Sequence, residues 1–350
     1  MNTNTTLGKG SWIQLNQRQA ARAGIFLLLL LLLSLPAAVQ AQFLYVVNNG
    51  TVTITGYSGP GGAVDLPDTI NGLPVTSLGD FAFSNCTNLT SVTIGTNVTK
   101  IGQKVFLYCS GLTAITVNPQ NTQYSSVDGV LFNNSQTTLI AYPGGKVGAY
   151  AIANSVTKIE DSAFLFCTSL TSVTIPDSVT SIGVYTFSDC TSLTNATIGN
   201  GVTNNAGYVF FRCTSLTSVT IGTNVTIIGS YAFAGCTNLT SVTIPDSVTS
   251  IQAWAIAWCT TLTNITIPNN VTTIWNNAFT DCYSLTAVYF SGNAPSLPDS
   301  SVVFTGDTNA TVYYLPGTTR LGHDVWWSSD RAVDASESSH PPDVSGHPDG

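Results

Sequence analysis

Apolar residues recur along most of this chain with a fixed step of 23 positions. A leucine follows each cysteine by three positions and begins a run such as Leu-Thr-Ser-Val-Thr-Ile, whose β-branched residues favour a half-buried strand. A second apolar pair, such as Val98 and Ile101, follows this run in most repeats. A repeat this short cannot bury its own apolar side, so the pattern predicts coils that stack on one another. The cysteines that mark the step are Cys86, Cys109, Cys167, Cys190, Cys213, Cys236, Cys259 and Cys282.

The step is broken once, between Cys109 and Cys167, which are 58 positions apart. That interval holds one repeat of 23 residues and 35 further residues, with turn signals at Asn118-Pro119, Asp128-Gly129 and Pro143-Gly144-Gly145. We therefore expect a lengthened coil at about 112–166, inside a solenoid that spans 79–285.

The two ends of the predicted solenoid differ from the repeats, as capping segments do. Residues 42–78 contain two β-rich runs around Asn49-Gly50, a typical hairpin turn. Residues 286–318 contain the runs Val288–Phe290 and Ala310–Tyr314. We expect an N-terminal cap of strands at 42–78 and a C-terminal cap at 286–318.

Charge is scarce, with 8% charged residues and a net charge of −8. Few charges and many hydroxyls suit a solenoid with aliphatic side chains inside and hydroxyl rows outside. The chain has no cluster of Lys and Arg to neutralise phosphates, so we expect no nucleic-acid partner.

The N-terminal residues 1–41 have the three parts of a secretory signal peptide. Lys9, Arg18 and Arg22 are basic, Ile25 to Leu35 is apolar, and Val39-Gln40-Ala41 offers small residues for cleavage. The alternative is a transmembrane anchor, but the apolar stretch is shorter than the roughly 20 residues that a spanning helix needs. We expect cleavage near Ala41, export of the protein and no stable membrane span afterwards.

The repeat A-F-x-x-C-T-S-L-T-S-V-T-I-P-x-S-V-T-S-I-G, matched closely from Asp161 to Gly183, resembles the BspA-like leucine-rich repeat family of bacterial secreted and surface proteins. Val127–Phe132 and Leu139–Pro143 of the lengthened coil also resemble an element of that family, and the resemblance covers about 43–318. It implies an α/β-type, mostly β solenoid of 23-residue coils with a parallel sheet of short strands. It also implies adhesion or protein binding at the cell surface.

The segment 319–350 is polar and non-repetitive, and we expect it to be disordered. In similar proteins the stretch before it continues as Thr-Phe-Gly-Gly-Arg-Pro-Thr. Codons for Asp324 to Val333 can spell that continuation when read one base later, so we hypothesise that this tail is a frameshift product.

The eight cysteines admit three interpretations. Export and an even count favour disulfides, whereas a metal site would need clustered ligands, and no cysteine lies within four residues of another. The third interpretation is a buried ladder of free thiols. We favour the ladder, because side chains in one register point the same way, which is poor geometry for a disulfide.

Catalytic chemistry has little support in the sequence. His323, His340 and His347 all lie in the last 28 residues, and Asp177 and Asp246 occupy turn positions of the repeat. We expect a non-catalytic scaffold that binds a protein or glycan and needs no cofactor or metal. The alternatives are a carbohydrate-binding protein, a β-helical carbohydrate-active enzyme, or a structural envelope protein without a specific ligand.

Two registers of the repeat vary and hold many aromatic side chains. They form a candidate ligand surface if they are exposed, whereas the alternative is that they pack between the coils. The first register, two positions before the Phe or Ile that precedes each cysteine, contains Phe81, Tyr185, Tyr208, Tyr231 and Trp254, with Lys104, Ser162 and Asn277 elsewhere. The second, just before the cysteines, contains Tyr108, Phe166, Arg212 and Trp258.

Overall fold

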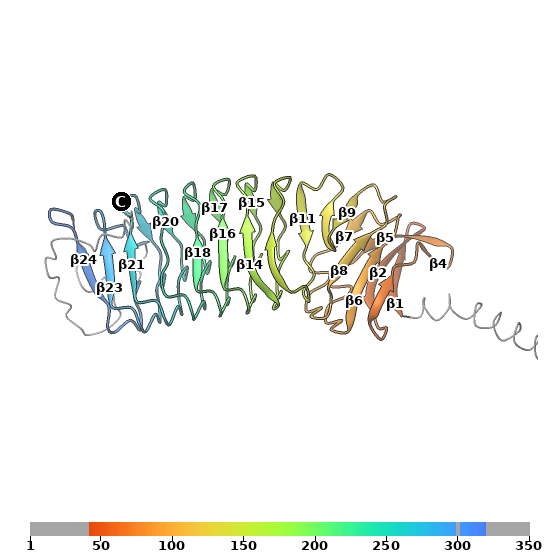
Figure 1. Cartoon of the computed structure of the whole chain (residues 1–350), viewed down its shortest axis with the longest axis horizontal. Coiled ribbons are helices and arrows are strands. Elements are labelled where there is room, and N and C mark those ends of the chain that lie inside the picture. The colour runs from red at the N-terminus through yellow and green to blue at the C-terminus, as the bar shows by residue number, and fades with distance from the viewer. Residues whose placement is uncertain (1–41, 299–301, 320–350) are drawn as a thin grey trace, which may run out of the picture.

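A computed structural model describes residues 42–298 and 302–319 as one elongated solenoid whose coils stand side by side along its long axis (Figure 1). The predicted signal peptide at 1–41 and all of the predicted tail after Thr319 lie outside the described residues. Within these two ranges there are short strands and turns but no α-helix. No helix in them has the length and apolarity to cross a membrane.

The first strand row is formed by the predicted Leu-Thr-Ser-Val-Thr-Ile runs. In β14 (Leu170–Ile175) the leucine, valine and isoleucine are buried and the threonines are exposed. Neighbouring strands pair in parallel, with Ser172 opposite Asn195 and Asn195 opposite Ser218, which confirms the 23-residue step. The other strands of this row are β3 (Gly62–Asp65), β6 (Leu89–Ile94), β8 (Ala114–Val117), β12 (Gly148–Ala151), β16 (Asn195–Ile198), β18 (Ser218–Thr220), β21 (Asn264–Ile267), β23 (Ala287–Phe290) and β24 (Thr311–Tyr314).

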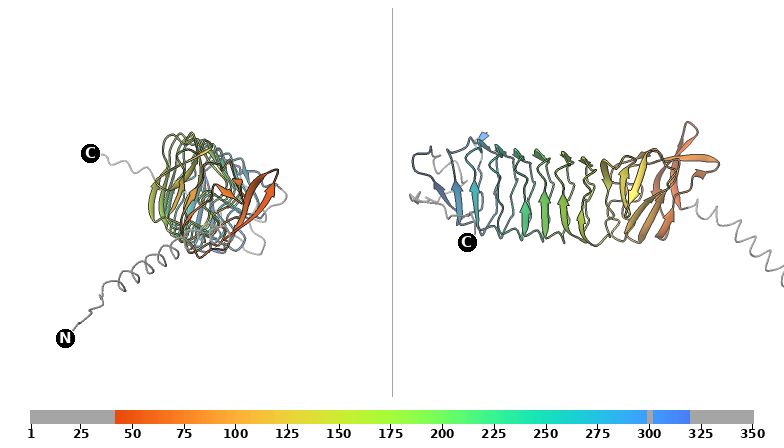
Figure 2. Two further views of the ribbon diagram at one scale, coloured as in Figure 1. Left: turned by 90° about the vertical axis from the view of Figure 1, so that its right-hand side faces the viewer. Right: turned by 45° about the horizontal axis from the view of Figure 1, so that its top comes forward.

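A second strand row follows the first turn of each coil, where the sequence indicated only an apolar pair. Its short strands also pair in parallel, for example Ser250 of one coil with Thr273 of the next. Viewed along the axis, the coils lie behind one another (Figure 2), and within the described residues each row is divided into three successive sheets. The row contains β2 (Thr51–Tyr57), β5 (Leu73–Leu78), β7 (Lys100–Ile101), β11 (Thr138–Ala141), β13 (Lys158–Ile159), β15 (Ser181–Ile182), β17 (Asn204–Asn205), β19 (Ile227–Ile228), β20 (Ser250–Ile251) and β22 (Thr273–Ile274).

The N-terminal end begins with the hairpin expected at Asn49-Gly50. Strand β1 (Phe43–Asn48) pairs antiparallel with β2, and both turn residues have positive φ. The twist of such a two-residue turn matches the twist of the two strands that it joins. The short strand β4 (Thr69–Ile70) pairs antiparallel with β5.

The lengthened coil contains an antiparallel meander of β9 (Tyr124–Val127), β10 (Val130–Asn133) and β11. Asp128 and Gly129, predicted as a turn, have φ of 50° and 77° and connect β9 to β10. After the meander, β11 rejoins the second strand row by pairing with β13, and β12 rejoins the first by pairing with β14. The hydrophobic core divides here into two clusters, one on each side of the meander.

The cysteines form the predicted ladder of free thiols, seven of them buried and Cys86 half-buried. Cys190 donates its thiol hydrogen to the carbonyl of Phe164 at 3.1 Å, and Cys213 donates to that of Phe187 at the same distance. Burial raises the pKa of Cys236 to about 12, so this thiol stays neutral. The seven buried cysteines therefore each tie their coil to the coil before it.

Candidate functional site

The third side of the solenoid is built from arms, the six-residue segments that end at each cysteine. In every arm but 104–109, the first, third and fifth N–H groups donate to carbonyls of the next coil. In one arm, Tyr208 donates to Ser230, Phe210 to Ala232 and Arg212 to Ala234, each at 2.8 Å. The arms are 81–86, 104–109, 162–167, 185–190, 208–213, 231–236, 254–259 and 277–282.

Both variable registers of the sequence have left-handed backbone conformation in every arm. The first and fifth arm residues all have φ between 52° and 76°. This geometry costs an L-residue roughly 1–2 kcal/mol, unless it is glycine or, less often, Asn or Asp. It turns the first and fifth side chains outward while the second, third and sixth point inward: Val209, Phe210 and Cys213 are buried.

The sequence contains a signal for this conformation at the fifth arm position. The fifth arm position holds Asn85, Asp189, Gly235 and Asp281 in four of the arms. These are the residue types that visit the left-handed region most readily. Tyrosine and tryptophan do not adopt the left-handed region readily. Their presence at equivalent positions therefore needs an explanation other than backbone preference.

Five of the predicted residues form one continuous stack, which we call the aromatic ladder: Tyr185, Tyr208, Tyr231, Trp254 and Trp258. The rings of Tyr185 and Tyr208 are 4.4 Å apart, and those of Tyr208 and Tyr231 are 4.6 Å apart. Trp254 follows at 5.9 Å with its plane 6° from that of Tyr231, and Trp258 stacks on Trp254 at 5.2 Å. All five side chains are half-buried on the outer surface.

Two further side chains flank the ladder: Phe211, which lies outside both variable registers, and Lys104, which belongs to the first. Phe211, the fourth residue of its arm, sets its edge against Tyr208 at 5.6 Å and against Tyr231 at 6.2 Å. At the other end, the Lys104 ammonium lies 5.5 Å from the ring centre of Tyr185, a cation–π distance. The signal for Phe211 in the sequence is that it is aromatic, whereas the equivalent position of the other arms holds Ser, Ala, Thr or Leu.

The remaining predicted residues lie outside the ladder. Tyr108 and Phe166 form a separate pair at 4.2 Å. Phe81 is 50% exposed and stacks on no ring in the described part of the chain. Arg212 is exposed, and its Nε lies 3.6 Å from the Asp189 carboxylate. The structure therefore divides the nine candidates into a ladder, a pair and two isolated side chains.

The ladder presents ring edges and hydroxyls to solvent, because each ring face is covered by the next ring. Desolvation in the stack raises the pKa of Tyr208, and the phenols of Tyr185 and Tyr231 add to this effect. A phenol with a raised pKa is neutral at physiological pH and acts as a hydrogen-bond donor and acceptor. The surface is thus amphipathic and rigid. Among the described residues, no group of three or more His, Cys, Asp or Glu is placed to hold a metal ion.

Comparison with protein families identifies the repeats. The model of the BspA type leucine rich repeat region matches in six copies, over residues 64–155, 142–233 and 206–329. No curated protein matches the chain significantly.

Several solved structures are similar to this chain at low sequence identity. A leucine-rich repeat protein from Bacteroides ovatus is 22% identical, with a TM-score of 0.50, over 78% of this chain and 83% of that one. One from Eubacterium ventriosum is 21% identical, with a TM-score of 0.44, over 69% and 92%. A leucine rich cell surface protein from Faecalibacterium prausnitzii is 23% identical, with a TM-score of 0.42, over 72% and 94%.

Proposed function

Since this chain belongs to the BspA-type leucine-rich repeat family, we propose that it is a non-catalytic scaffold that binds a protein partner outside the cell membrane. The aromatic ladder is the proposed contact surface. The observation that carries this proposal is the placement of five aromatic side chains at left-handed backbone positions on the outer face of adjacent coils.

Energetics support a role beyond packing. Each left-handed aromatic residue costs roughly 1–2 kcal/mol, whereas each stacked pair contributes about 0.5–1.5 kcal/mol beyond its buried area. Stacking therefore does little more than offset the strain. Glycine or asparagine, used elsewhere in these registers, would avoid the strain without a ladder. Strained backbone conformations of this kind cluster at active sites and ligand-binding sites.

The geometry favours a protein over a sugar as the partner. Sugars stack on open ring faces, but the faces between Tyr185 and Trp254 are covered by neighbouring rings at 4.4–5.9 Å. Edges and hydroxyls of tyrosine and tryptophan are the groups that dominate protein interfaces, since they offer large contact area with few rotatable bonds. Action outside the membrane is supported by the signal-peptide pattern of 1–41.

The proposal is tested by capturing partners with the full chain, immobilised through a C-terminal tag, from extracts of cell-surface proteins after chemical cross-linking. We expect the Tyr208→Ser/Tyr231→Ser variant to lose at least tenfold in captured partner. Tyr283→Ser is the matched control, because Tyr283 is 57% exposed and lies outside the ladder. Equal capture by the ladder variant and the control, with the fold retained, would overturn the proposal. Selective retention of polysaccharide on a glycan array would favour the carbohydrate-binding alternative.

A further inference from the structure

The regular stack of coils is interrupted between the arm 104–109 and the lengthened coil. In each of the other arms, the first, third and fifth N–H groups donate to carbonyls of the following coil. The equivalent N–H groups of Lys104, Phe106 and Tyr108 have no hydrogen-bond acceptor within the described residues. The second strand row breaks at the same place, since β7 pairs with β5 and β11 pairs with β13, but β7 does not pair with β11.

The interruption opens a cleft of about 640 Å³, within the size range of small-ligand sites, roughly 300–1,000 Å³. One wall is β7 with the beginning of its arm, and the other is β11 with residues 160–162. Tyr124 of β9 also lines the cleft, and its hydroxyl accepts the Ile101 N–H at 3.1 Å. The phenol takes the place of the backbone hydrogen bond that a neighbouring strand would have made with β7. It thereby holds the two walls of the cleft at a fixed separation.

Charge is concentrated in this cleft. Only 8% of the chain is charged, yet five of the thirteen lining residues are. Lys100 and Lys104 line one wall and form no ion pair in the described residues, while Glu160 and Asp161 line the other. Asp80, the fifth, accepts the Gln103 N–H at 2.8 Å.

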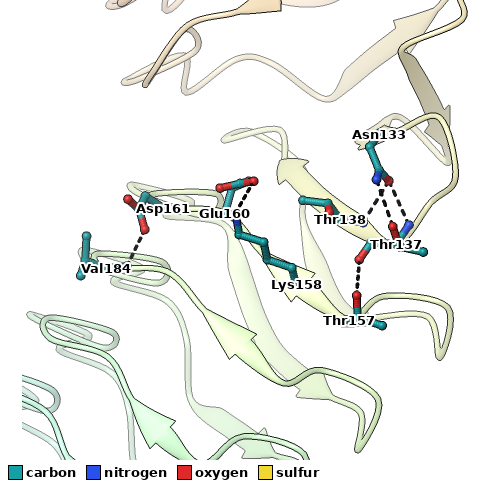
Figure 3. Close-up of polar contacts among 8 residues, drawn as sticks. All are labelled: Asn133, Thr137, Thr138, Thr157, Lys158, Glu160, Asp161 and Val184. Atoms are coloured by element: carbon teal, nitrogen blue, oxygen red, sulfur yellow. Dashed lines mark hydrogen bonds and ion pairs between the residues drawn. The ribbon is translucent and has the colours of Figure 1, made fainter.

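The acidic wall is held in place by its neighbours, as Figure 3 shows. Lys158 pairs with Glu160 at 2.8 Å, and Asp161 accepts the Val184 N–H at 2.9 Å through one carboxylate oxygen. The turn before β11 is braced by Asn133, whose side-chain oxygen accepts the N–H groups of Thr137 and Thr138. A carboxylate has about four acceptor sites, so both acidic residues keep sites for a ligand.

We propose that this cleft binds a short peptide in its zwitterionic form. The peptide carboxylate lies against Lys100 and Lys104, its ammonium against Glu160 and Asp161, and a peptide carbonyl accepts the Lys104 N–H. A simple anion would satisfy one wall only. An uncharged sugar would displace water from both walls without pairing their charges, which is costly. Thr138 and Gln103 add hydrogen-bonding groups, and Ile140 adds an apolar contact. The cleft adjoins the aromatic ladder at one residue, since the Lys104 ammonium also lies 5.5 Å from the ring centre of Tyr185.

The test is a titration of trialanine with the full chain, in which binding is measured by ligand-observed NMR. We expect saturable binding with a Kd on the order of 0.1–1 mM, given the affinity that ligands of this size reach. N-acetyl-trialanine and trialanine amide each lack one charge, and each should bind at least tenfold more weakly. These two peptides test the charge requirement on the unaltered protein, so the result does not depend on a variant that folds.

A second arm of the experiment locates the site. The Lys100→Gln/Lys104→Gln variant should lose at least tenfold in trialanine affinity, whereas Lys146→Gln, which alters a lysine outside the cleft, should keep it. Failure of trialanine to saturate by 10 mM (about ten times the upper expected Kd), equal binding of the three peptides, or full binding by the folded double variant would each overturn the proposal. Lys100→Gln alone leaves Lys104 beside Tyr185, so capture of a protein partner through the ladder should be unchanged in this single variant while its trialanine affinity falls, which separates the two sites.

Discussion

The ring of Tyr208 lies face to face with the ring of Tyr231, with centroids 4.6 Å apart and planes 7° apart. The two residues are one repeat apart in sequence, and both have left-handed backbone conformation. Their separation is close to the roughly 4.8 Å between adjacent strands, so the stacking of coils places one ring directly over the other. The contact is therefore a consequence of the repeat, but its energy depends on which residues occupy the register.

A double-mutant cycle measures that energy. We expect Tyr208→Ala and Tyr231→Ala to show a coupling of about 0.5–1.5 kcal/mol in the free energy of unfolding by urea, since each single substitution already removes the stack. Tyr208→Ala combined with Tyr283→Ala is the control, and its effects should add because Tyr283 is outside the ladder. Additive effects for Tyr208 and Tyr231 would mean that the stack contributes no stability of its own.

Ser162 occupies the same register as these tyrosines, but its side chain makes no stacking contact that would offset the strain of the register. Its φ is 60°, and its buried hydroxyl has no hydrogen-bond partner among the described residues. Ser162→Gly removes both the strain and the unsatisfied hydroxyl, so we expect it to stabilise the fold by about 1–2 kcal/mol. Ser172→Gly, in strand β14, should instead destabilise by about 0.5–1 kcal/mol, as glycine does inside strands. Both changes are read as shifts of the thermal unfolding midpoint, and a lower midpoint for Ser162→Gly would contradict this assignment.

Sequence periodicity was sufficient for most of the fold, because each coil repeats the same choices. Leu170, Val173 and Ile175 alternate with threonines, and this pattern defines a strand with one buried face. The second strand row was not predicted, since a pair such as Ser181–Ile182 is too short to carry an alternation. The left-handed arm positions were not predicted. Asn85 and Gly235 are residue types that favour positive φ, but Tyr185 and Trp258 at equivalent positions are not.

The cleft could not be predicted from the repeat, because it exists where the repeat fails. Lys104 and Glu160 are 56 positions apart and belong to different coils. They approach one another only because β9 to β11 fold into a meander that parts the stack. A cluster of charged residues around the lengthened coil, in a chain with so few charges, was the available signal. It indicated an unusual place but not which side chains would face one another.

Thiol reactivity distinguishes the buried cysteine ladder from its end. Cys86 is half-buried, whereas the other seven cysteines are buried. Burial raises the pKa of Cys86 above its ordinary value and that of Cys109 to about 12, so neither holds much thiolate at pH 8. We expect a thiol reagent at pH 8 to modify Cys86 slowly in the native protein and all eight cysteines after unfolding.

The readout is mass spectrometry of the labelled protein over time, with Cys86→Ala as the control that should remain unlabelled while folded. Fast labelling of several native thiols would contradict the burial of the ladder. Failure of the unfolded protein to reach eight labels would indicate disulfides in place of free thiols.

Asp307 makes stability depend on pH near the C-terminal end of the solenoid. It is 1% exposed, and burial raises its pKa from 3.8 to about 8, with the Asp281 carboxylate adding to the rise and a backbone hydrogen bond at Cys282 opposing it. The folded protein therefore keeps a proton that the unfolded chain releases between about pH 4 and pH 8. Its contribution to stability is greatest below pH 4, is lost as the pH rises to about 8 and is constant above that. The slope within this window is roughly 1 kcal/mol per pH unit.

Asp307→Asn keeps the shape of the neutral side chain without the titration, so the variant should be the more stable protein at pH 8.5 and nearly equal to the original at pH 4. Urea unfolding at both pH values checks this, and parallel changes in the two proteins would show that another group causes the dependence.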